Sequence, residues 1–481
     1  MQRLESYKRI INLALMAINF ALEVAIFSYF WVNHFQPSVV YELRKFHRMG
    51  HLAEISLYAG ILLMLSIMYG GMRLGYMKIA ETVFSQILAT ILANIMIYME
   101  LSVLARQAFV PQMFLAMMFD QMVVIVVYTN LVGAVYKRLF PPRKLLLISG
   151  NLSTNEIKSK FESRRDKYVI TDEINVNMGT EKVLQYILDG YFNMKFNAVV
   201  IWDIPVDRRN RIIKFCYAQS IRFYLMPKIT DVIISGAEEL KVFDSPMLLT
   251  REYCLTMEQR FIKRTIDIVF ALILIIVTSP IMLIAAIAIK LYDGGDVFYK
   301  QVRCTKDLRE FKILKFRSMR QDAEKDGVAR LASKHDDRIT PVGRIIRKCR
   351  ADELPQLFNI LKGDMTFIGP RPERPEIIKQ YVELMPEFVL RTKVKAGLAG
   401  YAQVYGKYNT APYDKLKLDL TYIEKYSLWL DIKLMMLTIK VLFWPDSTEG
   451  VEVEQISALR AALDREKSTG ENIVETDDDM S

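Results

Sequence analysis

An adjacent pair of carboxylates, Asp352-Glu353, lies in the segment RKCRADELPQLFNILKGDMTFIGPRPERP, and basic residues flank the pair on both sides along the chain. A carboxylate can act as a covalent nucleophile or hold a divalent cation, whereas guanidinium groups match the geometry of phosphate oxygens. The flanking bases are Arg347, Lys348, Arg350, Arg371 and Arg374. This combination predicts a site where a phosphorylated substrate is held and attacked.

The acid pair precedes an apolar run with helical spacing, and Pro355 falls in the first turn of that run. The pattern predicts a helix that starts here with Asp352 as its N-cap. The free amides of the helix N-terminus would add to the attraction for a phosphate. Capping alone is the simpler interpretation of an Asp before a helix, but the surrounding arginines favour a phosphate-binding role as well.

Two further segments carry candidate phosphate-binding residues. In KILKFRSM, residues 312–319, strand-like alternation places Lys315 and Arg317 on one face. In GPRPERP, prolines stiffen the backbone around Arg371, so less entropy is lost when this side chain binds an anion. Taken alone, the two segments could equally be a charged strand and a solvated turn.

The composition suits a membrane partner or an anionic substrate. The 481 residues carry a formal charge of +10 and are 52% hydrophobic, which is high for a soluble protein. The basic residues are not interleaved with aromatic residues, so we expect no nucleic-acid binding. The four cysteines lack metal-ligand spacing and are interpreted as reduced structural thiols. Only His335 of the four histidines lies after residue 51, which argues against a His-based triad or a zinc site downstream.

Four long apolar stretches open the chain, at 10–32, 52–70, 83–104 and 113–135, and each approaches or exceeds the roughly 20 residues that cross a bilayer. They predict a four-helix transmembrane bundle over residues 1–140. The flanking segments on the N-terminal side of the membrane carry nine Lys and Arg residues, and those on the other side carry four. This asymmetry predicts that both ends of the bundle lie in the cytoplasm.

Pro141-Pro142 mark the next boundary. Short apolar runs at 145–149, 168–171, 198–202 and 221–226 then alternate with helix-length polar segments. The alternation predicts a Rossmann-like βαβ module with a parallel sheet over 141–250. The first run leads into GNLSTNE, which lacks the GxGxxG pattern, so a regulatory or oligomerising role is favoured over dinucleotide binding.

A second membrane element is predicted at about 262–291. Its apolar core is interrupted in the middle by Ser279 and Pro280, and proline removes a backbone donor and kinks a helix. Cations on both flanks favour a re-entrant hairpin over a kinked but complete span. A hydroxyl beside the break can satisfy carbonyls that the proline leaves free.

The C-terminal part contains an amphipathic segment and an acidic tail. The run within 414–445 is interpreted either as a helix in the membrane interface or as an ordinary packing helix. Residues 447–481 turn acidic, and we expect them to be disordered.

Three motifs in order, KFRSM, RADELPQLFNILKGDMTFIGPRP and VKAGLAGYAQVYGK, resemble the bacterial sugar transferases over roughly 258–445. The preceding spans and βαβ module resemble the large members of this family. Such enzymes transfer a sugar-1-phosphate from a UDP-sugar to polyprenol (undecaprenyl) phosphate, the first membrane step of exopolysaccharide, O-antigen or capsule synthesis. The resemblance implies a monotopic α/β catalytic domain over 251–446 on the cytoplasmic face of the bacterial inner membrane, anchored by a re-entrant helix broken at Ser279-Pro280.

The resemblance also implies roles for individual residues. Asp352 attacks the sugar-bearing phosphorus, UMP leaves, and polyprenol phosphate takes the phosphosugar from Asp352. Glu353 is the implied ligand of a Mg²⁺ cofactor. Lys315, Arg317, Arg347, Arg371 and Gln403 are the implied contacts to substrate phosphates. Ala396 and Ala399 stand where the family motif usually has Pro and Thr, which leaves fine positioning open.

Two other functions stay open at this point. One is a membrane-tethered nucleotide-sugar epimerase or oxidoreductase that uses the βαβ module. The other is a non-catalytic scaffold that binds anionic lipid. The sequence also leaves open which UDP-sugar is used, and it is compatible with a homodimer.

Overall fold

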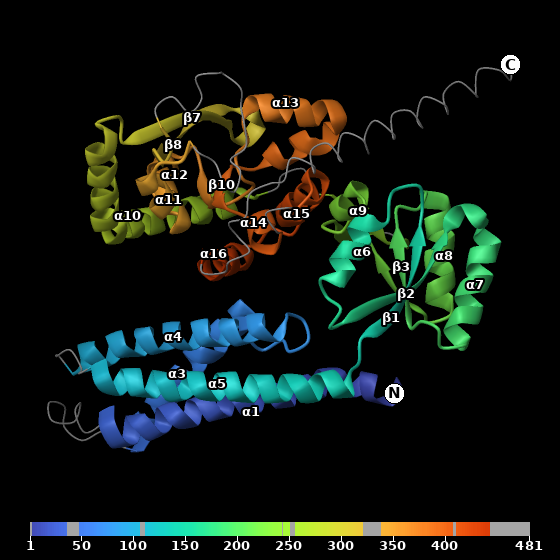
Figure 1. Cartoon of the computed structure of the whole chain (residues 1–481), viewed down its shortest axis with the longest axis horizontal. Coiled ribbons are helices and arrows are strands. Elements are labelled where there is room, and N and C mark those ends of the chain that lie inside the picture. Colours follow the sequence, from blue (N-terminus) through green and yellow to red (C-terminus); the bar gives the residue numbers. More distant parts are fainter. Residues whose placement is uncertain are drawn as a thin grey trace. The chain divides into compact units, whose positions relative to one another are not determined.

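A computed structural model describes residues 2–35, 48–105, 111–242, 244–250, 255–320, 338–406 and 410–442 (Figure 1). The chain divides into two compact units, Met1–Met226 and Pro227–Ser481, and each is described by itself. Helices predominate in both units, and the first also contains a parallel sheet.

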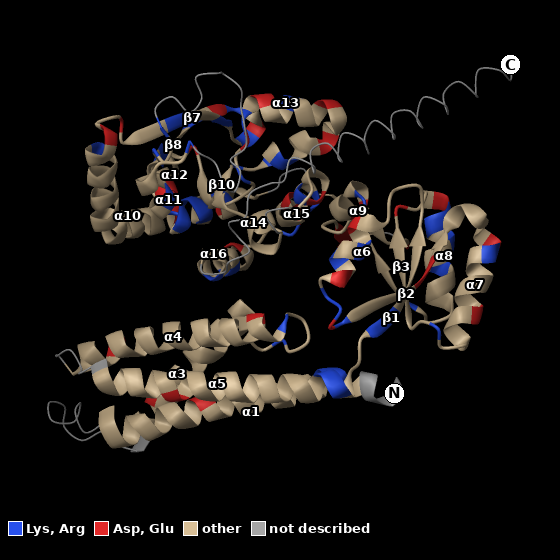
Figure 2. Ribbon diagram, viewed as in Figure 1, with Lys and Arg blue, Asp and Glu red and all other residues tan. Residues whose placement is uncertain are grey.

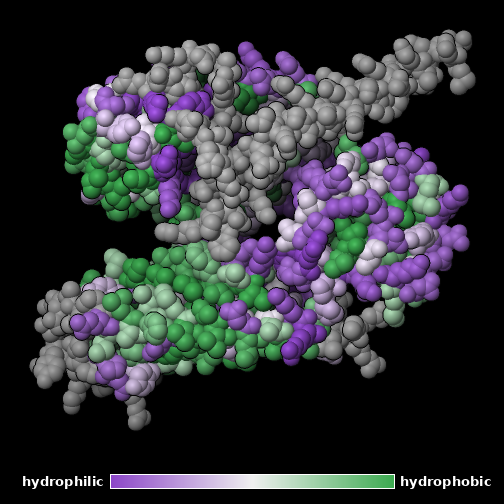
Figure 3. Space-filling view, viewed as in Figure 1, coloured by the Kyte–Doolittle hydropathy of each residue, from purple (hydrophilic) through white to green (hydrophobic). Residues whose placement is uncertain are grey.

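The first unit begins with four long apolar helices that pack against one another: α1 (Gln2–Phe30), α3 (Arg48–Tyr69), α4 (Ile79–Leu104) and α5 (Pro111–Leu139). Together with α10 of the second unit, they are the five helices among the described residues that are long and apolar enough to cross a membrane. Apolar side chains cover much of their outer surface in the view of Figure 3. Large exposed apolar surfaces are rare on soluble proteins, so this is a membrane protein.

The four helices α1, α3, α4 and α5 are called the bundle below. The interior of the bundle contains polar side chains that form hydrogen bonds with one another. Glu23 of α1 accepts hydrogen bonds from Asn19 and from Thr90 of α4, each at 2.7 Å. Gln121 of α5 donates to the Tyr58 hydroxyl of α3 at 2.7 Å. These bonds link α1 to α4 and α3 to α5 where their polar groups could not reach water.

The rest of the first unit is a four-stranded parallel sheet in the order β2-β1-β3-β4. Its strands are β1 (Arg143–Ser149), β2 (Tyr168–Asn175), β3 (Ala198–Trp202) and β4 (Arg222–Leu225). Alternate residues of β1 face opposite sides, packing with α7 (Thr180–Phe192) and α8 (Val206–Ala218) on one face and with α6 (Asn155–Glu162) on the other. The predicted helices and the predicted parallel sheet are confirmed.

The second unit is built against α10 (Met257–Asp293), which bends into two arms in Figure 1. Pro280 lies inside this helix and cannot donate to the carbonyl of Ile276, four residues earlier. The Ser279 hydroxyl donates to that carbonyl at 2.8 Å. The side chain beside the proline thus satisfies the backbone group that the proline leaves free.

Both ends of α10 are held by the same folded unit. Near its start, Arg264 donates to the carbonyls of Ile360 and Leu361, each at 2.6 Å. The second arm packs through Ala285 and Ile289 against a cluster that includes Phe316 and Ala351. Both arms of the helix therefore contact this unit.

The remaining elements enclose a large apolar core, which is separate from the smaller cluster at the second arm of α10. A hairpin of β7 (Phe298–Cys304) and β8 (Glu310–Phe316) lies beside a short parallel pair, β9 (Thr366–Ile368) and β10 (Gly397–Ala399). A second, short hairpin pairs β5 (Glu238–Leu240) with β6 (Met247–Leu249). The helices are α9 (Ile229–Ile234), α11 (Pro341–Lys348), α12 (Gln356–Lys362), α13 (Pro375–Leu384), α14 (Tyr401–Tyr405), α15 (Pro412–Glu424) and α16 (Leu428–Leu442).

The predicted interface helix corresponds to α16, which buries Asp431, Leu434 and Leu437 against the core and exposes Trp429. It therefore packs on the unit along one face, as the packing interpretation requires. The acidic tail, 447–481, lies outside the described residues.

Candidate active site

The acid pair lies in a tight turn between two helices. After α11, Arg350 adopts a left-handed conformation with φ 53°, and Ala351–Glu353 form a single 3-10 turn. Helix α12 begins only at Gln356, and Pro355 at its N-cap makes no side-chain cap. The prediction that Asp352 caps the helix is wrong, because the extra turn carries its carboxylate away from the first amides of α12. Anion binding here must rest on side chains.

Glu353 is held by two cations that come from different parts of the chain. Its Oε1 accepts from Lys315 of β8 at 3.0 Å and from Arg371 at 2.9 Å. Burial alone would raise the pKa of Glu353, but the combined field of Lys315, Arg371 and Arg350 holds that pKa well below its usual range. Glu353 is thus ionised at any physiological pH.

Asp352 has the opposite electrostatic environment. Burial, and next the adjacent charge of Glu353, raise the pKa of Asp352 to about 6, while Lys315, Arg347 and Arg371 lower it less. One member of the pair is therefore firmly ionised, and the other is poised to lose its proton near neutral pH. Two carboxylates with pKa values driven apart are typical of sites that assign them different chemical tasks.

Arg371 is placed to contact a substrate as well as Glu353. Its side chain is 43% exposed, whereas the Glu353 side chain is 14% exposed. The backbone of its loop is clamped from two sides, because Arg391 donates to the Arg371 carbonyl at 3.1 Å and Arg303 donates to the Pro372 carbonyl at 3.2 Å. The fixed backbone limits where the guanidinium can go.

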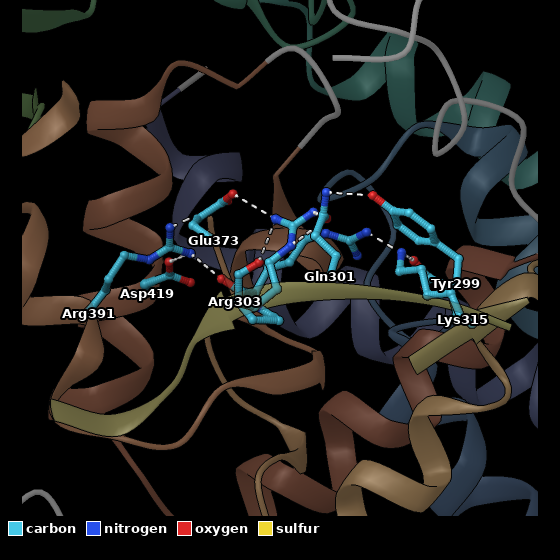
Figure 4. A network of polar contacts seen from close by, with 10 residues as sticks. Tyr299, Gln301, Arg303, Lys315, Glu373, Arg391 and Asp419 are labelled. Atoms are coloured by element: carbon cyan, nitrogen blue, oxygen red, sulfur yellow. Dashed lines mark hydrogen bonds and ion pairs between the residues drawn. The ribbon is translucent and has the colours of Figure 1, made fainter. Parts of the chain in front are cut away.

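A polar network along β7 supports this clamp (Figure 4). Gln301 donates to the Tyr299 hydroxyl at 3.0 Å and accepts from Arg303 at 2.7 Å. Glu373 lies 3.6 Å from both Arg303 and Arg391. The side chains at 299, 301 and 303 share one face of the strand, and that period-two alternation is the sequence signal that could have identified them.

Two buried contacts also position the site and were not predicted. Arg391 forms an ion pair at 2.8 Å with Asp419 of α15, and both side chains are almost fully buried. Asn359 of α12 donates to the Lys312 carbonyl and accepts from the Leu314 amide, both at 2.9 Å. The Asn359 amide thus bonds α12 to β8, the strand that carries Lys315, and this fixes the position of Lys315 relative to Glu353.

The other predicted site residues lie in different surroundings. Arg317 follows β8 and forms an ion pair with Asp293 at the end of α10, at 2.8 Å. It therefore braces the second arm of that helix and does not join Lys315 at Glu353. In α14, the amide of Gln403 has both polar atoms buried without a hydrogen-bond partner. Such a group is costly unless a ligand satisfies it.

The described residues contain no cluster of three or more His, Cys, Asp or Glu side chains that could hold a metal ion. Mg²⁺ commonly uses one or two carboxylates and takes its other ligands from water and substrate phosphates. The Asp352-Glu353 pair fits that pattern.

The bacterial sugar transferase family matches residues 258–445, the stretch that contains all of these groups. A UDP-glucose:undecaprenyl-phosphate glucose-1-phosphate transferase of Caulobacter vibrioides is 38% identical over 190 residues, which cover 38% of this chain and 71% of the relative. The chain belongs to the bacterial sugar transferase family.

Two longer relatives are also similar to part of this chain. A UDP-N-acetylgalactosamine-undecaprenyl-phosphate N-acetylgalactosaminephosphotransferase of Aeromonas hydrophila is 45% identical over 185 residues, 38% of this chain and 44% of the relative. A UDP-glucose:undecaprenyl-phosphate glucose-1-phosphate transferase of Escherichia coli is 36% identical over 211 residues, 43% of this chain and 44% of the relative. The matches thus cover less than half of these two relatives.

Proposed function

We propose that this protein transfers a sugar-1-phosphate from a UDP-sugar to polyprenol phosphate. The observation that carries the proposal is the acid pair, in which Glu353 is locked to Lys315 and Arg371 while burial and the charge of Glu353 raise the pKa of Asp352 to about 6. The relatives' names, which pair UDP-sugars with undecaprenyl phosphate, support this substrate class.

The proposed reaction has two displacements at one phosphorus. A carboxylate oxygen of Asp352 bonds to the sugar-bearing phosphorus of the donor, and the bond from that phosphorus to the bridging oxygen breaks to release UMP. A phosphate oxygen of polyprenol phosphate then attacks the same phosphorus and displaces Asp352, which gives polyprenyl-diphosphate-sugar. Aspartate serves as a covalent nucleophile toward phosphorus in other phosphoryl-transfer enzymes.

Cationic side chains stabilise the charge that develops in both steps. Arg371 is the exposed member of the cluster, and Lys315 and Arg347 also lie close enough to lower the pKa of Asp352. We assign donor phosphates to Arg371 and Arg347. A Mg²⁺ ion bound through Glu353 and the substrate phosphates would supply further charge neutralisation.

The membrane placement completes the proposal. The bundle helices span the bacterial cytoplasmic membrane with both ends of the bundle in the cytoplasm, as the Lys and Arg asymmetry supports. Helix α10 enters and leaves by the cytoplasmic leaflet, which is supported by the contacts that hold both of its ends to one folded unit. The catalytic carboxylates then face a lipid-bound acceptor at the inner leaflet, and a homodimer is compatible with this arrangement.

The test uses the full chain in nanodiscs with Mg²⁺, polyprenol phosphate and a panel of UDP-sugars that includes UDP-glucose and UDP-N-acetylgalactosamine. We expect UMP release with at least one donor and, without acceptor, a phosphosugar adduct on Asp352 by mass spectrometry. Asp352→Asn should give neither. Product that accumulates with the Asn variant would refute the mechanism.

A separate outcome would refute the activity. If no donor yields UMP from protein that retains its α-helical circular dichroism, the scaffold function is favoured, and a copurified nicotinamide cofactor would favour the oxidoreductase.

A further inference from the structure

A second polar site lies in the first unit, far along the chain from the acid pair. A cavity of about 170 Å³ opens where the start of α1, the end of α5, the loop before α4 and the first strand of the sheet meet. This is roughly ten times the space that one water molecule needs. The cavity can therefore hold a phosphate group together with part of the molecule that carries it.

Four cations from separate segments line this cavity: Lys8 of α1, Lys137 of α5, Arg143 of β1 and Lys167 in the turn before β2. Asp166 is the only acid among the residues that line it, and Arg164 already binds this carboxylate through Nε and Nη2, at 3.0 and 3.2 Å. The cavity thus has an excess of positive charge that a bound anion would offset.

Aromatic rings hold two of these amines in place at the wall. The Lys8 ammonium lies 5.5 Å from the ring centre of Tyr136 and 4.9 Å from that of Phe140. The Lys167 ammonium lies 4.6 Å from the ring centre of Tyr76. Burial, followed by repulsion from Arg164, lowers the pKa of Lys167, and an anion bound beside this amine would stabilise its charged form.

Apolar side chains line the cavity together with these cations. They are Ile79 of α4, Leu139 of α5, Leu74 in the loop before α4 and Phe140 just after α5. Figure 2 shows Lys and Arg at this end of α5, whereas the long middle of the helix carries almost none. A ligand with an anionic head and an apolar body matches a cavity that is lined by both cationic and apolar side chains at the end of α5.

We propose that this cavity binds the phosphate group of an anionic membrane lipid. The lipid would join the cytoplasmic end of the bundle to the sheet, since its phosphate contacts Arg143 and Lys167 of the sheet region as well as Lys8 and Lys137 of the helices. This inference needs the membrane placement of the bundle but not the proposed transferase chemistry.

The test measures lipid retention by native mass spectrometry of the full chain released from nanodiscs that contain phosphatidylcholine and phosphatidylglycerol. The Asp352→Asn background removes turnover, so failure of the transferase proposal leaves the result intact. We expect the double variant Lys137→Gln/Lys167→Gln to retain phosphatidylglycerol about tenfold less well. The control Lys182→Gln/Lys214→Gln changes the net charge equally on exposed helices of the same unit and should retain it as before.

Three further arms identify the source of the phosphate. Polyprenol phosphate that replaces phosphatidylglycerol in the cavity would support a lipid ligand and identify it as a phosphate monoester. Inorganic phosphate or glycerol-3-phosphate that displaces the lipid at millimolar concentration would refute the lipid source. Equal retention by the cavity variant and its control would refute the site, and Lys8→Gln serves as the test variant if the double variant misfolds.

Discussion

The protein buries glutamates in two regions and satisfies them in opposite ways. In the bundle, Glu23 is 3% exposed, and the two side chains that donate to it, Asn19 and Thr90, are uncharged. In the catalytic unit, Glu353 accepts from Lys315 and Arg371, both cations. The first glutamate lies in a helix long and apolar enough to cross a membrane, and the second lies beside the proposed nucleophile, Asp352.

The type of donor that each glutamate accepts from indicates the role of its region. Neutral donors fix the shape of a buried carboxyl group without supplying a charge, and this suits helix packing inside a bilayer. Cations stabilise the ionised form and leave positive charge for a second anion, and this suits phosphate chemistry. Burial of an acid is therefore a poor guide to function until its partners are known.

The largest expected effect contrasts the two glutamates directly. Glu353→Gln removes the charge that orients Lys315 and Arg371, and we expect UMP release to fall by about 100- to 1,000-fold. Glu23→Gln should leave turnover per folded molecule unchanged, because its contacts serve packing. Equal losses of UMP release in both variants, measured on protein with matched helical content, would contradict the different roles of Glu353 and Glu23.

A second contrast concerns stability, which Asp352→Asn should raise and Glu23→Gln should lower. The raised pKa of Asp352 means that folding disfavours its charged form, so at pH 7.5 the neutral variant Asp352→Asn should unfold at a higher temperature. A displacement from 3.8 to about 6 corresponds to at most about 3 kcal/mol. Glu23→Gln puts a donor where two donors already point and should lower stability by about 1–2 kcal/mol. Thermal unfolding in nanodiscs measures both, and a loss of stability in Asp352→Asn would contradict the electrostatic description.

The smallest effect is a shift in the pH profile. The attacking form of Asp352 is ionised, so the rate should fall about tenfold per pH unit below about 6 and be level above about 7. Lys315→Gln removes a cation that lowers the pKa of Asp352, so its residual activity should require a higher pH. Lys158→Gln, which alters a pair with Glu173 in the first unit, should leave the profile in place. An unmoved profile in the Lys315 variant would show that a different group titrates.

Much of the fold could be predicted because local patterns specify it. The apolar runs at 145–149 and 198–202 lie in adjacent parallel strands, β1 and β3, since fully buried strands require continuous apolar residues. Pro280 lies inside α10, and Ser279 supplies the expected hydroxyl contact to the Ile276 carbonyl. These features depend on residues close together in the chain.

The site could be predicted only where its residues share a short motif. Glu353 and Arg371, which contact each other, are 18 residues apart in one segment that the sequence already marked as a candidate site. The left-handed Arg350 was missed, because a non-glycine residue in that conformation leaves no sequence signal.

Long-range pairs were also beyond prediction. Arg391 and Asp419 are separated by two secondary-structure elements, and nothing in the sequence matches this base to that acid. Arg317 was grouped with Lys315 from strand alternation, but the strand ends at Phe316, so the arginine turns instead toward Asp293.

The attachment of α10 at both ends has a mechanical consequence under the proposed re-entrant placement. Arg264 bonds to the end of α12, and Ala285 and Ile289 share a cluster with Ala351, the residue next to the proposed nucleophile. Any thinning or thickening of the lipid leaflet would pull on both attachments at once. Bilayer thickness would then affect the position of the turn that carries Asp352. Lipid composition would change the transfer rate without any direct contact with the substrates.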